Sequence, residues 1–265
     1  MEPKITNGNL ASHVLIVIPS YNEIENLPRL TSRIFSKFKD IHLLVVDDNS
    51  PDGTSELVRN LQDIYSNLFL LTRNKKLGVG SAYVSGYLWG LERGYQLMGQ
   101  MDADLSHRVR DLGAMIDFMQ NNDSTDLLIG SRWIKGGGTE NWPLRRIALS
   151  RIGNSYISYM LDLPARDSTA GFRLFRSEIL EALNLKDVES KGFSFQIEML
   201  EKIMALGGSV SEFPIIFRER EYGHSKITAG IVFEALRLVT IRGIKCKSSR
   251  IKAIFRFRNA SEHTN

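Results

Sequence analysis

Residues 14–23 read VLIVIPSYNE, and residues 43–54 read LLVVDDNSPDGT. Each stretch begins with a short apolar run typical of a buried strand and ends in polar or turn-forming residues. Helix-compatible segments follow over Glu23–Phe38 and about Thr54–Tyr65, so the chain opens with two strand–helix units. Such alternation predicts an α/β fold with a mainly parallel, Rossmann-like sheet flanked by helices.

The same theme continues along the chain, less regularly in its second half. The remaining expected elements are strands at Leu68–Leu71, Leu97–Met101, Leu127–Gly130 and Val210–Phe217, and helices at Val79–Arg93, Leu144–Leu161, Phe193–Leu206 and Ile227–Ile244. In open α/β sheets, ligands bind beyond the carboxyl ends of the strands. We therefore expect a site around residues 19–23, 47–54 and 102–107, which directly follow three of the strands.

The composition is that of a globular protein. The chain has 265 residues, 43% hydrophobic and 24% charged, which excludes a disordered, collagen-like or disulfide-stapled chain. Cys246 has no second cysteine to pair with, which indicates a reducing compartment. The sequence contains no run of about 18 uncharged apolar residues, so no membrane-spanning helix is predicted. We expect one domain over residues 13–244, with an N-terminal extension (1–12) and a basic C-terminal tail (245–265).

The positive charge is concentrated near the end of the chain. The formal net charge is +4, but seven basic residues and no acidic one fall within residues 242–258. Without those seven, 27 basic residues stand against 30 acidic ones, so the rest of the chain carries −3. Together with Ile251, Ile254, Phe255 and Phe257, this tail suits an anionic membrane surface. A nucleic-acid patch and a plain solubilising end are the alternatives that the pattern leaves open.

Gly78-Val79-Gly80, just before a predicted helix, raises the question of a dinucleotide site. The dinucleotide fingerprint needs a third glycine where this chain has Tyr83, and it follows the first strand rather than the third. A glycine turn that caps the following helix is the preferred interpretation.

Asp102 and Asp104 carry more chemical information. In an extended segment, side chains two residues apart point to the same side. Two carboxylates held close together repel each other unless a cation lies between them. Mg²⁺ or Mn²⁺ with a bound diphosphate is the natural occupant, since hard cations take carboxylate and phosphate oxygens together. The alternative is a solvated acidic pair in a turn.

Residues 47–54 form a second acidic strand end. They favour a turn in which Asp52 or Thr54 caps the next helix. The functional alternative is a carboxylate that accepts hydrogen bonds from a nucleobase or ribose. Near the first strand end, Tyr21 could lie against the base and Glu23 could accept the ribose hydroxyls.

Several motifs then appear in a fixed order. They are IPSYNE at 18–23, VVDDNSPDGT at 45–54, MDADLSH at 101–107, GSR at 130–132, DSTAGFR at 167–173, GFSFQIE at 192–198 and FREREYGHSK at 217–226. The ordered set resembles the inverting, GT-A-fold family 2 glycosyltransferases. Within that family it is most similar to the dolichol-phosphate mannose synthases and their polyprenol-phosphate relatives. The resemblance covers about residues 13–235, nearly all of the chain.

The resemblance implies roles for individual residues. The nucleoside pocket would be lined by Pro19, Tyr21, Glu23, Val46 and Asp48. Asp102 and Asp104 would hold the metal on the donor diphosphate, with Ala103 passing close to the nucleotide. Ser106 stands where some relatives have a glutamine beside the metal, and it is a third, weaker candidate ligand.

The resemblance also implies cationic groups for the phosphates. Arg132, Arg220 and Lys226 would meet the donor diphosphate or the acceptor phosphate, and with Asp104 they form the expected catalytic set. Taken alone, an arginine such as Arg132 more often forms an ordinary surface ion pair. Arg173 is either structural or faces the acceptor.

The implied reaction is inverting transfer of mannose from GDP-mannose to dolichyl or polyprenyl phosphate. A phosphate monoester has a second pKa near 6, so the acceptor is already ionised and needs no general base. His107 and His224 would give minor electrostatic help at most. The alternatives are a sibling that uses UDP-glucose or another sugar, transfer to a hydroxyl of a glycan or protein, and a nucleotide-binding scaffold without turnover.

The chain departs from the resemblance in two places. Arg108 follows the histidine of the MDADLSH motif, where relatives often have proline or an acid. Many relatives carry C-terminal transmembrane helices, whereas this chain ends in the basic tail. It therefore looks like the type without such helices, on the cytoplasmic face of a membrane. Its surface or a small membrane-anchoring partner protein would hold it there, and no nucleic acid is expected as a partner.

Overall fold

The computed structural model describes residues 14–190, 192, 194–219, 236–244 and 247. A central sheet has the strand order β3-β2-β1-β4-β7-β5-β8, and β6 and β9 pair separately. The strands are β1 (Val14–Ser20), β2 (His42–Asp47), β3 (Leu68–Thr72), β4 (Leu97–Gln100), β5 (Leu127–Ser131), β6 (Gly138–Glu140), β7 (Arg173–Arg176), β8 (Val210–Pro214) and β9 (Ile216–Arg218).

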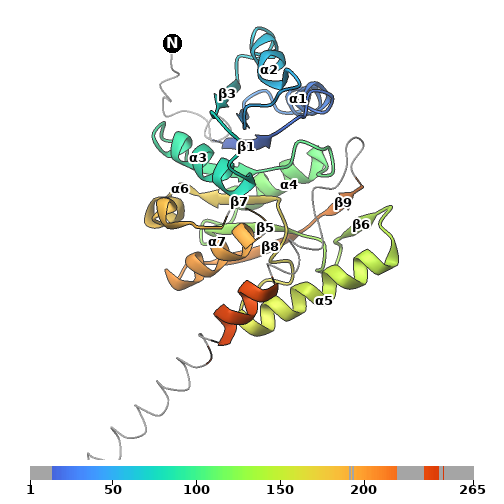
Figure 1. Ribbon diagram of the computed structural model, residues 1–265, viewed down its shortest axis with the longest axis vertical. Coiled ribbons are helices and arrows are strands. Elements are labelled where there is room, and N and C mark those ends of the chain that lie inside the picture. The colour runs from blue at the N-terminus through green and yellow to red at the C-terminus, as the bar shows by residue number, and fades with distance from the viewer. Residues whose placement is uncertain (1–13, 191, 193, 220–235, 245–246, 248–265) are drawn as a thin grey trace, which may run out of the picture.

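The helices form layers on both faces of the sheet. One face is packed by α1 (Leu27–Phe35), α2 (Thr54–Gln62) and α4 (Val109–Gln120), and the other by α3 (Val79–Leu91), α6 (Ser177–Ala182) and α7 (Ser194–Ala205). A short 3₁₀ helix, η2 (Leu185–Asp187), follows α6. The long α5 (Leu144–Leu161) lies beside the helical residues 236–244, far from β3 (Figure 1). The prediction of a single α/β domain with a mainly parallel, helix-flanked sheet is confirmed.

The β1 sequence explains why helices cover both faces. Leu15 and Val17 enter one buried cluster, while Val14, Ile16 and Ile18 enter the other. A continuous apolar run of this kind is typical of a parallel strand that is buried on both sides. On the face where Leu15 and Val17 are buried, α3 lies so close that a Cβ on Gly86 would overlap Val17. The glycine therefore sets the distance of α3 from the sheet.

Two parts of the second half differ from the prediction. The single strand expected over Val210–Phe217 is two strands, since β8 ends at Pro214 and β9 pairs with β6. Ile215 lies between them, buried, and its N–H donates to Ser131 O at 3.0 Å. The structure also has β7, which is antiparallel to β4 and β5 and which the sequence analysis did not predict.

The helices that were predicted agree with expectation, with ends shifted by a few residues, whereas α4, α6 and the short strand β6 were not predicted. For example, Glu23–Phe38 is a helix over Leu27–Phe35. Of the expected helix Ile227–Ile244, the structure describes only residues 236–244, which are helical. The tail lies outside the described residues except for Lys247. Among the described helices, none is long and apolar enough to cross a membrane.

Candidate active site

A cavity of about 280 Å³ opens at the carboxyl ends of β1, β2 and β4. It gathers predicted residues from four separate segments, namely Pro19, Tyr21, Glu23, Asp48, Asp102, Ala103, Asp104 and Arg132. Val46 is fully buried in the core on the α3 side of the sheet and is not among the lining residues. Arg220, His224 and Lys226 lie outside the described residues.

Asp104 is held by the turn that follows it. Its Oδ1 accepts the backbone N–H of Ser106 at 3.1 Å and also the Ser106 hydroxyl. The intervening Leu105 has a φ of 63°, a left-handed conformation that costs roughly 1–2 kcal/mol for a residue with a side chain. Ser106 is fully buried and does not line the cavity. In this position Ser106 orients Asp104 and does not face the cavity.

Asp102 is the more open of the two carboxylates, with 41% of its side chain exposed. The Tyr83 hydroxyl donates to its Oδ1 at 3.3 Å, and His107 Nε2 lies 3.4 Å from its Oδ2. Burial, reinforced by the charge of Asp102, holds the pKa of Tyr83 well above its usual value. Tyr83 therefore remains a neutral hydrogen-bond donor to this carboxylate.

The acidic pair fits a cation that is shared with a substrate. Among the described residues, no group of three or more His, Cys, Asp or Glu side chains could enclose a metal. Mg²⁺ typically uses one or two protein carboxylates and completes its shell with water and substrate phosphates. Asp102 and Asp104, both on the cavity wall, supply that kind of donor set.

The second acidic strand end divides into structural and cavity residues. Asp47 is fully buried and accepts the Ser55 hydroxyl at 2.7 Å and the N–H of Ser50 at 3.0 Å. Asp48 lines the cavity, where its carboxylate accepts Arg73 Nε at 2.5 Å and the Leu77 N–H at 3.1 Å. Because a carboxylate offers about four acceptor positions, Asp48 can still accept further hydrogen bonds.

Asp52 belongs to the structural part of that loop. It accepts the Thr54 N–H at 3.0 Å and the Ile24 N–H at 3.3 Å, so it joins the ends of β1 and β2. The N-cap residue of α2 is Gly53, with a φ of 87° and no side-chain cap, instead of the expected Asp52 or Thr54.

Tyr21 and Glu23 line the same cavity as Asp48, and the segment that carries them is hydrogen-bonded to the segment after β2. The Lys76 ammonium lies 3.8 Å from the centre of the Tyr21 ring. Glu23 accepts the Asn26 side-chain amide at 2.8 Å, which fixes one of its oxygens. An aromatic ring, two carboxylates and a cation together can hold a flat, hydrogen-bonding group such as a nucleoside.

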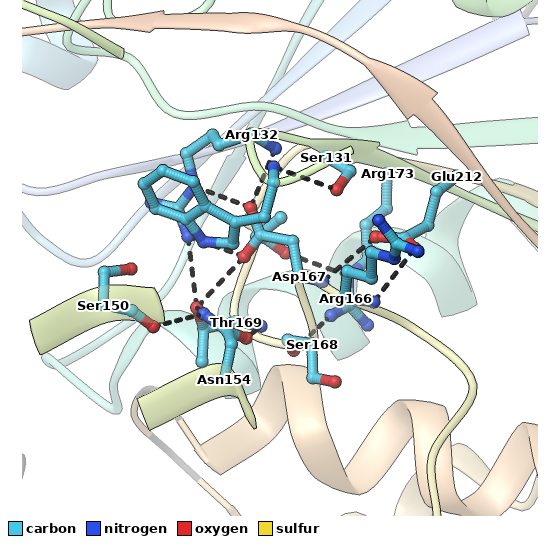
Figure 2. Close-up of polar contacts among 12 residues, drawn as sticks. Ser131, Arg132, Ser150, Asn154, Arg166, Asp167, Ser168, Thr169, Arg173 and Glu212 are labelled. Atoms are coloured by element: carbon cyan, nitrogen blue, oxygen red, sulfur yellow. Dashed lines mark hydrogen bonds and ion pairs between the residues drawn. The ribbon is translucent and has the colours of Figure 1, made fainter. Parts of the chain in front are cut away.

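Arg132 forms a buried, bidentate pair with Asp167 (Figure 2). Its Nε and Nη2 donate to the two Asp167 oxygens at 2.7 Å each, and Nη2 also donates to Thr169 Oγ1 at 3.1 Å. A guanidinium carries five N–H donors, so the two on Nη1 are left for the cavity that Arg132 lines. A pre-oriented fork of this kind suits a phosphate oxygen.

Arg173 is structural. It is fully buried and donates to the carbonyls of Ser168, Ala170 and Gln196 at 2.7–2.9 Å. Burial lowers the pKa of Arg173 to about 10, which leaves it protonated at neutral pH. Its three bonds tie the loop before β7 to α7, so both present their residues to the cavity.

Several lining residues were not predicted from the sequence. They are Lys76, Tyr83, Trp142, Arg146, Thr169, Gln196 and Phe217. The sequence drew attention to Tyr83 only because it stands where the dinucleotide fingerprint requires glycine. Nothing in the sequence pointed to Arg146. It stacks on Trp142 at 3.7 Å and pairs at 2.6 Å with Glu219, which is far away in the sequence. Gly78, with a φ of 96°, is the N-cap of α3, as the glycine-turn interpretation predicted.

Comparison with known proteins identifies the family. The family model described as glycosyl transferase family 2 matches residues 15–183. The chain is 41% identical over 243 residues to a polyprenol monophosphomannose synthase from Mycolicibacterium smegmatis, covering 91% of each chain. It is also 41% identical to an undecaprenyl-phosphate mannosyltransferase from Micrococcus luteus, covering 91% of this chain and 98% of the other. The protein belongs to glycosyl transferase family 2.

Solved structures agree on the fold. Glucosyl-3-phosphoglycerate synthase from Mycobacterium tuberculosis, crystallised with Mn²⁺ and UDP, superposes with a TM-score of 0.61 at 16% identity, covering 92% of this chain and 84% of that one. A mannosyltransferase from Pyrobaculum calidifontis, in complex with GDP-Man and Mn²⁺, gives 0.54 at 14% identity, covering 94% and 79%. At these identities the likeness establishes a shared glycosyltransferase fold, as the GT-A prediction expected.

Proposed function

We propose that this protein transfers mannose from GDP-mannose to a polyprenyl or dolichyl phosphate, with inversion at the sugar carbon. The observation that carries the proposal is its 41% identity, over 91% of its length, to two relatives whose names specify mannosyl transfer to a polyprenyl phosphate. The intact acidic pair and the oriented Arg132 weigh against a scaffold without turnover.

The cavity supports a phosphate acceptor. Its described acidic residues are Glu23 and Asp48 beside Tyr21, and the candidate metal pair Asp102 and Asp104. No further carboxylate or histidine lines the described part of the cavity as a general base. A hydroxyl acceptor needs such a base, whereas a phosphate monoester is already ionised at neutral pH.

The described residues divide the work of this reaction. Asp48, Glu23 and Tyr21 would bind the nucleoside, and the Nη1 donors of Arg132 would bind a phosphate oxygen. A divalent cation, Mg²⁺ or Mn²⁺, held by Asp102 and Asp104 would offset the charge on the leaving diphosphate. Arg220 and Lys226 are proposed to complete the phosphate site. Rate enhancement would then come from positioning and charge stabilisation.

We expect GDP to bind more tightly than UDP, by about tenfold, which corresponds to one or two well-made hydrogen bonds to guanine. Calorimetric titration of both nucleotides in the presence of Mg²⁺ or Mn²⁺ measures the difference. A preference for UDP would instead favour the sibling activity, transfer of glucose from UDP-glucose to the same lipid.

We further propose that the protein works as a peripheral protein at a membrane surface. Along α5, four apolar side chains are strongly exposed: Leu144 (84%), Leu149 (63%), Ile152 (67%) and Tyr159 (73%). The exposed Arg145 and Arg151 accompany them, and Arg146 on the same helix lines the cavity. Apolar side chains flanked by arginine suit an anionic bilayer. Contact through this face of α5 would hold the cavity near the headgroups.

Replacing Leu149 and Ile152 together by serine is expected to weaken binding to anionic vesicles about tenfold, because each side chain loses part of its burial in the lipid. Deleting residues 245–265 should weaken it further. Vesicle co-sedimentation at about 0.1 M salt measures both effects. Ile64→Ser is the matched control, since Ile64 is 69% exposed just beyond α2. Equal binding by all variants would assign anchoring to a partner protein.

A further inference from the structure

A buried chain of amide groups lies behind the acidic pair. Gln100, at the end of β4, is fully buried. Its Oε1 lies 2.5 Å from the Tyr87 hydroxyl, and its Nε2 lies 2.9 Å from Gly171 O and 2.8 Å from Gln196 Oε1. Gln196, at the start of α7, is 7% exposed and lines the cavity.

The donors and acceptors in this series of hydrogen bonds fix which way each side-chain amide faces. The Gly171 carbonyl can only accept, so the group that Gln100 turns toward it must be its NH₂. That NH₂ then meets Gln196, which must present its oxygen in return. Tyr87 meets the remaining Gln100 oxygen and must donate to it, which agrees with the burial that holds the pKa of Tyr87 well above its usual value.

The orientation leaves the amide nitrogen of Gln196 for the cavity. Within the described part of the chain, Nε2 of Gln196 has no acceptor at hydrogen-bond distance. Two contacts bring the segments next to Gln196 close to the acidic pair. The Phe195 ring stacks on Tyr83, which donates to Asp102, and a Cβ on Gly171 would lie 3.6 Å from Asp102 Oδ2.

We infer that Gln196 is a specificity-determining residue whose Nε2 donates a hydrogen bond to a hydroxyl of the transferred hexose. This inference rests on the proposed function. A neutral amide matches a neutral hydroxyl, while the phosphates have the charged Arg132 fork as a partner. Tyr87, Gln100 and Gly171 act through Gln196 as positioning groups, because they prevent its amide from flipping.

The test compares the affinity of GDP-mannose with that of GDP in each variant. Gln196→Met removes the donor without adding charge. Gln196→Glu keeps an oxygen for Gln100, so it preserves the buried chain if the methionine variant does not fold. We expect the preference for GDP-mannose over GDP to fall about 3- to 10-fold in each, as for one hydrogen bond. Effects on the guanosine cancel in this ratio, and the uncharged Gln196→Met also leaves the electrostatics at the diphosphate unchanged. Gln120→Glu, at the exposed end of α4, is the matched control and should leave the ratio unchanged.

An unchanged ratio in the folded variants would overturn the inference. If the KM for polyprenyl phosphate rose at the same time, Gln196 would contact the acceptor and not the hexose. If the proposed function itself were wrong, the unaltered protein would not bind GDP-mannose, which distinguishes that result from a failure of the inference about Gln196.

Discussion

Replacing Asp104 by asparagine is expected to lower mannosyl transfer by about 10²- to 10³-fold, the usual effect of removing one key electrostatic group from an active site. The substitution is nearly isosteric and keeps an oxygen for the Ser106 N–H, so the fold should persist. Its effect would come from the lost charge, which is needed to hold a cation on the diphosphate. Transfer assays and thermal melts of the same preparation measure the two properties separately.

Asp63→Asn is the matched control for this prediction, since Asp63 is an exposed aspartate at the end of α2. It should leave transfer unchanged. Excess chelator added to the unaltered protein should lower transfer as much as Asp104→Asn does. Full transfer by Asp104→Asn, or by protein shown to be free of metal, would contradict the assignment of the acidic pair.

Removing Asp167 is expected to cost both stability and activity. Asp167 is fully buried and neutralises Arg132, whose side chain is 10% exposed. Removing one partner of a buried ion pair typically costs about 3–5 kcal/mol, because the other charge is left uncompensated. For Asp167→Ala this corresponds to a fall in Tm on the order of 10 °C. Thermal melts and transfer assays on Asp167→Ala measure the two losses.

A paired replacement separates the two losses. Arg132→Met with Asp167→Leu removes both charges and fills the space with apolar groups, which is often neutral or stabilising for a buried pair. We expect Tm to recover most of its loss while transfer stays about 10²-fold or more below normal, because the fork is gone. Recovery of activity along with stability would mean that Arg132 acts only through the fold.

The acidic residues of the site could be located from the sequence because each follows an apolar strand. Asp102 directly follows a run that reads as a buried strand, and Asp48 and Glu23 lie in the short segments after two other such runs. Parallel strands bring their carboxyl ends to one edge of the sheet. That rule depends only on hydrophobic pattern and order. The structure brings these residues to one cavity, and their individual roles stay predictions.

What the sequence could not show depends on contacts between distant segments. Asp167 and Arg132 are 35 residues apart and lie in loops after different elements, so no spacing rule joins them. Val46 was assigned to the pocket by resemblance, but its alternation within β2 turns it into the core. The short β7 was missed because its ends are arginines, and the buried Arg173 is satisfied by three carbonyls that only the folded chain supplies.

The most direct test of the central claim is transfer of radiolabelled sugar to polyprenyl phosphate in anionic vesicles, with GDP-mannose and UDP-glucose in parallel reactions. The account predicts label in the lipid fraction from GDP-mannose only, and only when polyprenyl phosphate and a divalent metal are both present. Lipid label from UDP-glucose instead would contradict the assigned donor. Nucleotide binding without any labelled lipid from either donor would contradict the assignment as an enzyme of this reaction.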